Sequence, residues 1–286
     1  MRKIVLPTDF SKNAWNAILY ALEFFKKEYC TFYLVNVYTP VLYRMDNLPG
    51  PSMQGADWNL DRSLDGLEKT LARIKEEYFN YRHNFELLSA FNTLPDELKD
   101  IGRKHKVDLI VMGTQGATGA KELFLGTNTM HVIGKAEVPV LVIPKDYGFR
   151  EIKHVLFATG YRSKHSKREL APLMDLIERF GVDLHVLHAL EHEQLLEEEI
   201  KNREHLKKLL VEIPHVSFVQ SNGINVPSLI YDYVEENHIG LVVMMNTKHS
   251  FLERLLVKQK IDVVGYHSKV PFLVIPEPAQ LYTKRS

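Results

Sequence analysis

The chain contains the same sequence pattern twice, and this internal repeat limits its fold more than any other feature. Three pairs of segments match in the same order along the chain: residues 5–9 with 156–160, 108–113 with 240–245, and 138–144 with 270–276. With 286 residues, the chain is long enough for two domains of ordinary size. We therefore predict two domains of one fold, residues 1–146 and residues 151–278, with the boundary near residues 145–148.

Each copy alternates short apolar runs with segments of helical periodicity. In the first copy, the runs predicted as strands are residues 3–7, 34–37, 85–88, 109–112 and 140–143. Two apolar stripes follow the i, i+3, i+4 spacing of a helix: Ala14, Ala17, Ile18, Ala21, Leu22 and Phe25, and then Leu60, Leu64, Leu67, Leu71, Ile74 and Tyr78. Apolar strands that alternate with helices are typical of a parallel sheet with helices on both faces and right-handed crossovers. The fold class is therefore α/β.

Several residues suit the ends of the predicted helices. Ser11 is placed to cap the first helix. A third helix opens at residues 93–96, with Pro95 in its first turn and Asp96 near the positive end of the helix dipole. In the second copy, residues 191–208 are rich in charge with apolar residues interspersed, which predicts a solvated amphipathic helix.

The first copy is longer than the second between its second and third strands. The extra residues are 39–59, which are rich in Pro, Gly, Met and aromatic side chains. We interpret them as a long loop, which is either a lid or contact surface or a simple surface excursion.

Composition and charge exclude several classes of partner. Lys+Arg and Asp+Glu both number 36, so no overall field draws nucleic acid or an anionic membrane to the chain. The apolar runs are too short to span a bilayer, and a strand-like segment begins almost at Met1, where a signal peptide would stand. The single cysteine, Cys30, fits a reducing compartment, and we interpret it as a buried packing residue rather than a reactive thiol. We expect a cytoplasmic protein.

The first copy carries a glycine motif directly after the apolar run 108–112. Gly113, Gly116, Gly126 and Thr127 form the pattern G-x2-G-x9-G-[ST]. Glycine permits positive φ and lets a ligand approach the main chain closely. A glycine loop between a buried strand and the start of a helix suits a phosphate group, because free backbone N–H groups and the helix dipole favour an anion. The motif indicates a nucleotide site.

Two other segments reach the same edge of the predicted sheet. Ligands of open parallel sheets bind beyond the carboxyl ends of the strands. The loop after the first strand places Asp9 there, and the second strand ends there at Val37. Asp9 suits a ribose hydroxyl or a base nitrogen, but it equally suits an Asx-turn or cap at the first helix. Thr127, Asn128 and Thr129 can donate side-chain hydrogen bonds to phosphate, or serve only as helix caps.

Together, Pro-Thr-Asp-Phe-Ser at 7–11, Val-Asn-Val at 35–37 and the glycine pattern at 113–127 resemble the universal stress protein family. The match extends over both halves, so the chain resembles a tandem member. The resemblance implies, in each half, a doubly wound parallel sheet of five strands (adenine nucleotide alpha hydrolase-like). Because family members dimerise through the last strand, it also implies that the two halves pair as an intrachain pseudo-dimer. A homodimer of whole chains is a further possibility.

The resemblance also implies a set of ligand-binding residues, since the complete motif belongs to the ATP-binding branch of the family. The implied ligand is ATP, ADP or AMP, with or without Mg²⁺. The residues that match the family's site are Thr8, Asp9, Val37, Met112, Gly113, Gly116, Gly126, Thr127, Asn128 and Thr129.

The second copy departs from this pattern at every glycine of the motif. Its residues at the matching positions are Met245, Lys248, Lys258 and Gln259, and Gly160 stands in place of Asp9. Long side chains fill positions that would have to approach phosphate closely. We expect no nucleotide site in the second copy.

Three hypotheses for function remain open. The first is an adenine-nucleotide-binding regulatory protein of the stress response, whose ligand state alters its choice of an unknown protein partner. The second is a slow ATPase, although the sequence offers no nucleophile–base pair and no histidines at metal-ligand spacing. The third is an interaction scaffold that needs no ligand.

Overall fold

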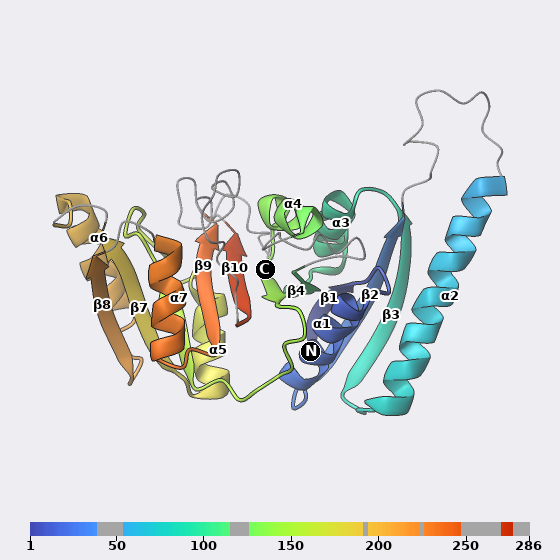
Figure 1. Ribbon diagram of the computed structural model, residues 1–286, viewed down its shortest axis with the longest axis horizontal. Coiled ribbons are helices and arrows are strands. Elements are labelled where there is room, and N and C mark those ends of the chain that lie inside the picture. The colour runs from blue at the N-terminus through green and yellow to red at the C-terminus, as the bar shows by residue number, and fades with distance from the viewer. Residues whose placement is uncertain (39–53, 115–125, 191–193, 223–225, 247–269, 277–286) are drawn as a thin grey trace, which may run out of the picture. The chain divides into compact units, whose positions relative to one another are not determined.

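The computed structural model describes residues 1–38, 54–114, 126–190, 194–222, 226–246 and 270–276 (Figure 1). The described residues up to Phe149 form one compact unit, and those from Arg150 onward form a second. The elements of the first unit are β1 (Arg2–Pro7), α1 (Lys12–Phe24), β2 (Cys30–Tyr38), α2 (Gln54–Glu77), β3 (His83–Phe91), α3 (Leu94–His105), β4 (Leu109–Gly113), α4 (Thr127–Lys135) and β5 (Val140–Ile143). Those of the second unit are β6 (His154–Ala158), α5 (Ala171–Phe180), β7 (Asp183–Leu190), α6 (Glu197–Leu209), β8 (Val216–Asn222), α7 (Val226–Glu236), β9 (Leu241–Asn246) and β10 (Phe272–Pro276).

The first unit contains the predicted parallel sheet. Its strand order is β3-β2-β1-β4-β5, and the pairs within it are all parallel. The five predicted strands are confirmed, each within a residue or a few of its predicted bounds. Cys30 is completely buried at the start of β2, which confirms its interpretation as a packing residue.

Helices cover both faces of this sheet, as the strand order requires. The chain steps from β1 to β2 to β3 in one direction and then returns to β4 and β5, so right-handed crossovers place α1 and α2 on one face and α3 and α4 on the other. The contacts agree, since α2 packs on β2 and β3 while α3 packs against α4. The predicted stripe of α1 is confirmed: Ala14, Ala17, Ile18, Ala21, Leu22 and Phe25 are all buried.

Helix α2 corrects two details of the sequence prediction. It begins at Gln54, so the end of the predicted 39–59 loop is helical, and residues 39–53 lie outside the described residues. Leu67 and Ile74 are buried as predicted, but Leu60 and Leu64 are exposed. The buried position in that turn is Ser63, whose hydroxyl lies 2.7 Å from the Ser89 hydroxyl on β3. A polar contact between α2 and β3 therefore replaces the leucine contact that the spacing predicts.

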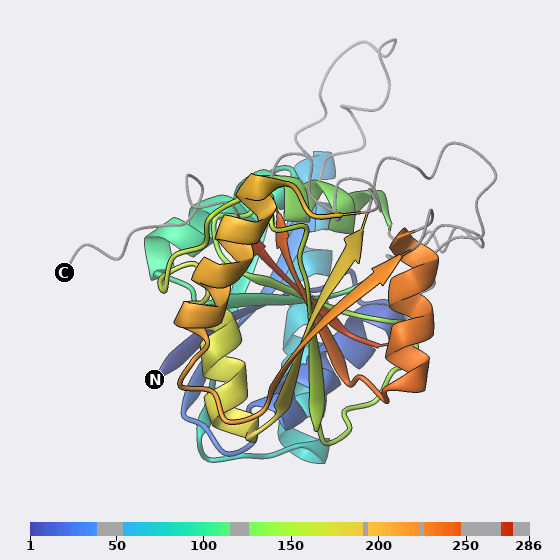
Figure 2. The same cartoon turned by 90° about the vertical axis from the view of Figure 1, so that its left-hand side faces the viewer.

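The second unit repeats the architecture with the strand order β10-β9-β6-β7-β8, again with parallel pairs. Figure 2 shows α5 and α6 on one side of its strands and α7 on the other. His185 and His188 face opposite sides of β7, as predicted: the His185 Nδ1 lies 2.8 Å from the Tyr233 hydroxyl on α7, and the His188 ring stacks on Tyr161. The predicted pairing of the two units stays a prediction.

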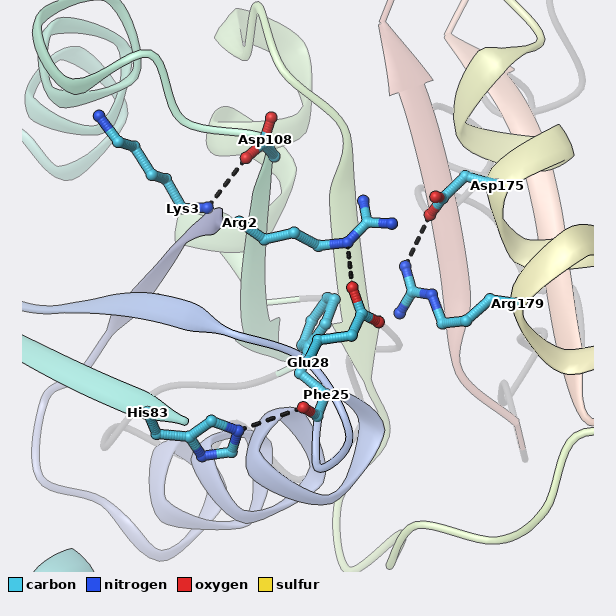
Figure 3. Close-up of polar contacts among 8 residues, drawn as sticks. All are labelled: Arg2, Lys3, Phe25, Glu28, His83, Asp108, Asp175 and Arg179. Atoms are coloured by element: carbon cyan, nitrogen blue, oxygen red, sulfur yellow. Dashed lines mark hydrogen bonds and ion pairs between the residues drawn. The ribbon is translucent and has the colours of Figure 1, made fainter. Parts of the chain in front are cut away.

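Polar contacts tie the amino-terminal edge of the first unit together (Figure 3). The Lys3 N–H donates to the Asp108 carboxylate at 2.9 Å, which aligns the starts of β1 and β4. The Arg2 guanidinium pairs with Glu28, and the His83 Nε2 lies 3.2 Å from the Phe25 carbonyl oxygen. These contacts are at the end of the sheet opposite the glycine motif. Among the helices that the structure describes, we find no candidate for a membrane span.

Candidate functional site

The candidate site of the first unit lies at the carboxyl ends of the strands, beside the point where the strand order reverses. Strand β1 lies between β2 and β4, and its pairing with β2 ends at Pro7 and Val35. Strand β2 continues beyond that pair to Tyr38, alongside β3. At the carboxyl edge, β2 therefore extends past the end of β1. This is where open parallel sheets bind ligands.

The turn after β1 is shaped by its own side chains. The Thr8 Oγ1 accepts a hydrogen bond from the Phe10 N–H, and the Asp9 Oδ1 accepts one from the Ser11 N–H, both at 3.0 Å. The Ser11 hydroxyl in turn accepts from the Ala14 N–H and caps α1, as predicted. The Asx-turn alternative for Asp9 is therefore confirmed, and its side chain is exposed at the edge of the site.

Asn36 supports this turn, although the sequence analysis did not select it. Its Nδ2 donates to the Thr8 carbonyl oxygen at 2.7 Å, and both residues are buried. A buried amide whose hydrogen bond is made holds the main chain in one position. The signal in the sequence is a single polar residue inside the apolar run of β2.

The end of β4 approaches α1 so closely that a side chain at position 113 would displace Asn13. A Cβ atom on Gly113 would lie 2.6 Å from the Asn13 Nδ2 and 2.9 Å from its Cγ. Met112, one residue earlier, is buried and pairs with Val142 on β5. The first glycine of the motif thus has a packing role within the protein.

Hydrogen bonds hold the two ends of the glycine loop close together, between the end of β4 and the start of α4. The Gly126 N–H donates to the Thr114 carbonyl oxygen at 2.6 Å, and the Thr129 hydroxyl donates to the Gly113 carbonyl oxygen at 3.0 Å. Residues 115–125, including Gly116, lie outside the described residues. Both ends of the loop are therefore fixed to the end of β4 and the first turn of α4.

Helix α4 begins at this point with its first turn facing the loop ends. Its N-cap is Gly126, which makes no side-chain capping bond, so the capping alternative for Thr127 is wrong. Thr127 and Asn128 are exposed. Thr129 is buried and its hydroxyl donates to the Gly113 carbonyl oxygen, while its role as a phosphate donor stays a prediction. The first N–H groups of a helix have no intrahelical acceptor, so this turn offers donors to an anion.

The second unit builds the same turn after β6 but buries it. The Tyr161 N–H donates to the Thr159 Oγ1 at 3.2 Å, and both Tyr161 and Phe10 have positive φ. The His188 Nδ1 lies 3.0 Å from the Thr159 carbonyl oxygen. This contact corresponds to the one between Asn36 and the Thr8 carbonyl oxygen in the first unit. Tyr161 is 1% exposed and Phe10 is 41% exposed. Burial raises the pKa of Tyr161 to about 12.

The structure therefore brings together most of the predicted site residues. Thr8, Asp9, Val37, Met112, Gly113, Gly126, Thr127, Asn128 and Thr129 all belong to the carboxyl edge of one sheet or to the helix that starts there. Gly116 lies outside the described residues, as do the second-unit counterparts of Gly116, Gly126 and Thr127, which are Lys248, Lys258 and Gln259. The contact of each of these residues with a nucleotide stays a prediction.

Relatives of known sequence match this chain in halves. Universal stress protein MJ0531 of Methanocaldococcus jannaschii is 30% identical over 148 residues, which are 50% of this chain and 82% of that protein. Universal stress protein MJ0577 of the same organism is 27% identical over 164 residues, which are 50% of this chain and 95% of that protein.

Solved structures match the chain over nearly its whole length. A universal stress protein from Archaeoglobus fulgidus covers 96% of both chains with a TM-score of 0.65 at 18% identity. Protein PA1789 of Pseudomonas aeruginosa covers 98% of this chain and 94% of its own, with a TM-score of 0.58 at 15% identity. At these identities the likeness shows a shared fold. The model of the universal stress protein family matches residues 1–144 and again residues 151–276. The chain therefore belongs to the universal stress protein family, as a tandem member with two copies of its domain.

Proposed function

We propose that this chain is an adenine-nucleotide-binding regulatory protein of the stress response, with its site in the first unit alone. The ligand is ATP or a related adenine nucleotide, and its presence alters which protein partner the chain selects. The phosphates lie in the glycine loop at the start of α4. The adenosine lies against the turn after β1 and the end of β2.

One observation carries the proposal more than the others. The hydrogen bonds from Gly126 to Thr114 and from Thr129 to Gly113 hold both ends of the glycine loop beneath the first turn of α4. These bonds hold both ends of the loop next to the free main-chain N–H groups in the first turn of α4. Such a group of donors suits a polyphosphate.

The difference between the two units supports a single site. In the first unit the turn after β1 is open, with Asp9 and Phe10 exposed. In the second unit Tyr161 occupies the equivalent turn and is buried. The sequence also places Lys248 and Lys258 where the first unit has motif glycines.

Thermal unfolding of the full chain with and without nucleotide tests the proposal. A ligand at about 100 times its Kd adds about 2.7 kcal/mol to the stability of the folded state, which is a clear shift in Tm. We expect ATP, ADP or AMP to produce this shift, and parallel runs with and without Mg²⁺ show whether the metal takes part. The variant Gly126→Lys introduces the residue that the second copy carries and is expected to remove the shift.

The control is Gly134→Lys, which makes the same substitution in the same helix. Gly134 has no neighbouring atom within 4 Å of an added Cβ, and it lies about 12 Å farther along α4. We expect this variant to keep the full ligand shift. If neither wild type nor control responds to any adenine nucleotide, the ligand-independent scaffold is the better account. If Gly126→Lys still responds like wild type, the glycine loop is not the phosphate site.

A further inference from the structure

The segment that follows β6 in the second unit is closed against α6 by two contacts to its main chain. The Asn202 Nδ2 donates to the Tyr161 carbonyl oxygen at 2.8 Å, and the His205 Nε2 lies 2.8 Å from the His165 carbonyl oxygen. Asn202 and His205 are both on α6, one turn apart. These two polar contacts therefore join the segment 159–170 to α6.

His165 lies at the centre of this contact in an unusual state for a histidine. Its side chain is 6% exposed, and its ring packs against the Phe157 ring with 5.8 Å between centroids. Neither ring nitrogen has a hydrogen-bond partner among the described residues. The nearest carboxylate oxygen is the Glu169 Oε2, 3.8 Å from the Nδ1, which is too far for a hydrogen bond. This environment accommodates a neutral imidazole and disfavours a charged one.

The charged and titratable groups around this contact come from three elements. Glu169 belongs to the segment itself, and its Oε1 already accepts a hydrogen bond from the Ser166 hydroxyl at 2.7 Å. Helix α6 contributes His205, and strand β7 contributes His188, which contacts the Thr159 carbonyl oxygen. Arg203 and Glu204 of α6 lie near Tyr161: Arg203 lowers the pKa of the Tyr161 hydroxyl, and Glu204 raises it. Strand β6 contributes the Phe157 ring.

Burial lowers the pKa of the His165 imidazole below its ordinary value of 6.5, and His205 adds to the effect, while Glu169 opposes it. In an opened segment the ring is solvated and regains its ordinary pKa. The open state therefore binds more protons than the closed state as the pH falls below 6.5. The closed contact is stable above that pH and weakens as the pH falls towards the lowered pKa.

We propose that residues 159–170 and helix α6 form a pH-sensitive latch, closed while the His165 ring is neutral and opened when that ring takes up a proton. Acidification frees α6 from the second unit without unfolding its sheet. The latch lies in the unit that lacks the nucleotide motif, so it gives the second copy a response of its own. It does not depend on nucleotide binding by the first unit.

Amide hydrogen exchange of the full chain, measured by mass spectrometry from about pH 7.5 to about pH 5.5, tests the latch. After correction for the chemical exchange rate, the opening constant for residues 159–170 and 197–209 is expected to rise by up to about tenfold per pH unit below 6.5. Exchange in the first unit serves as the internal reference. A wild-type opening constant that does not change with pH would overturn the proposal.

Two variants separate His165 from the other histidines. His165→Phe keeps an aromatic ring of similar shape and breaks no hydrogen bond to the ring nitrogens, so it is expected to fold and to lose the pH response. Glu169→Gln removes the carboxylate that favours the charged ring, so the pKa of the closed state falls further and the response is expected to extend to lower pH. His215→Gln, at an exposed position of the same unit, is the matched control and should respond like wild type. A wild-type response in His165→Phe, or a shift to higher pH in Glu169→Gln, would contradict the latch.

Discussion

Gly113 shows at the level of one residue how packing and ligand binding can require the same amino acid. The sequence motif explains this glycine by the approach of a phosphate group. The structure adds that any Cβ here would collide with the Asn13 side chain on α1. The residue therefore fixes the distance between β4 and α1, and with it the point where the glycine loop leaves the sheet.

Gly113→Ala is expected to destabilise the protein by about 1–3 kcal/mol, because the Asn13 side chain and its helix must shift to admit the methyl group. The free energy of unfolding from chemical denaturation measures this. Gly134→Ala is the control with the opposite sign: it meets no atom within 4 Å and is expected to stabilise α4 by about 0.5–1 kcal/mol. Equal effects from the two alanines would show that the close approach at Gly113 is not a constraint.

Asn36 is the residue that sequence reasoning missed, and the reason is physical. Its partner is the main-chain carbonyl oxygen directly after the neighbouring strand β1, so its role depends on the register of β1 against β2. A local sequence pattern does not show how one strand is aligned against its neighbour in the sheet. The register places the Asn36 amide beside the Thr8 carbonyl oxygen, to which it donates.

Asn36→Ala is expected to lower the free energy of unfolding by about 1–3 kcal/mol, because it leaves the buried Thr8 carbonyl oxygen without its donor. Asn36→His should lose less, since His188 already makes the same contact in the second unit. Denaturant titration of the two variants compares them directly. If the histidine variant is the less stable of the two, the turns of the two units are not equivalent.

At the level of elements, α3 is tied to the turn between α4 and β5 by an ion-pair cluster. The Arg103 Nε donates to the Glu137 carboxylate at 2.7 Å, and the Lys99 Nζ lies 3.2 Å from the same carboxylate. These groups hold α3 beside the segment that follows α4. The cluster therefore helps to position the helix whose first turn belongs to the candidate site.

The Arg103 guanidinium holds the pKa of the Glu137 carboxyl below its ordinary value of 4.5. The folded state thus binds fewer protons than the unfolded state just below pH 4.5, and the stability that the pair contributes is lost as the pH falls through the lowered pKa. Glu137→Gln is expected to cost up to about 1 kcal/mol at neutral pH and to flatten the loss of stability in acid. Denaturant unfolding curves of wild type and variant, at neutral pH and at a pH below 4.5, measure both effects. An unchanged acid slope would show that the pair contributes little.

The sequence predicts where a helix lies along the chain more reliably than which of its residues are buried. The stripe of α1 is buried as its spacing predicts, because the whole helix packs on the sheet. In α2 the spacing fails at Leu60 and Leu64, where the sheet offers the Ser89 hydroxyl and Ser63 takes the buried position. The first residues of the same helix were predicted as loop, since their composition resembles the loop before them. Which face a helix buries depends on partners that are distant in the sequence.

For the whole molecule, the repeat was sufficient to predict two α/β units, since matching strands and helices recur in the same order. It was not sufficient to predict how the two copies differ at one turn. The Thr8 and Thr159 turns share their hydrogen bonds and a positive φ two residues later, yet Phe10 is exposed and Tyr161 is buried. In the second turn, the Asn202 Nδ2 on α6 donates to the Tyr161 carbonyl oxygen, and the Tyr161 ring stacks on His188. Those residues are far from the turn in sequence.

The most direct test of a single nucleotide site is to find where a photoreactive azido derivative of ATP attaches to the full chain. After irradiation and digestion, the account predicts labelled peptides only from residues 1–149, with labelling blocked by excess ATP and lost in Gly126→Lys. Labelled peptides from residues 150–276 that unlabelled ATP displaces would contradict it.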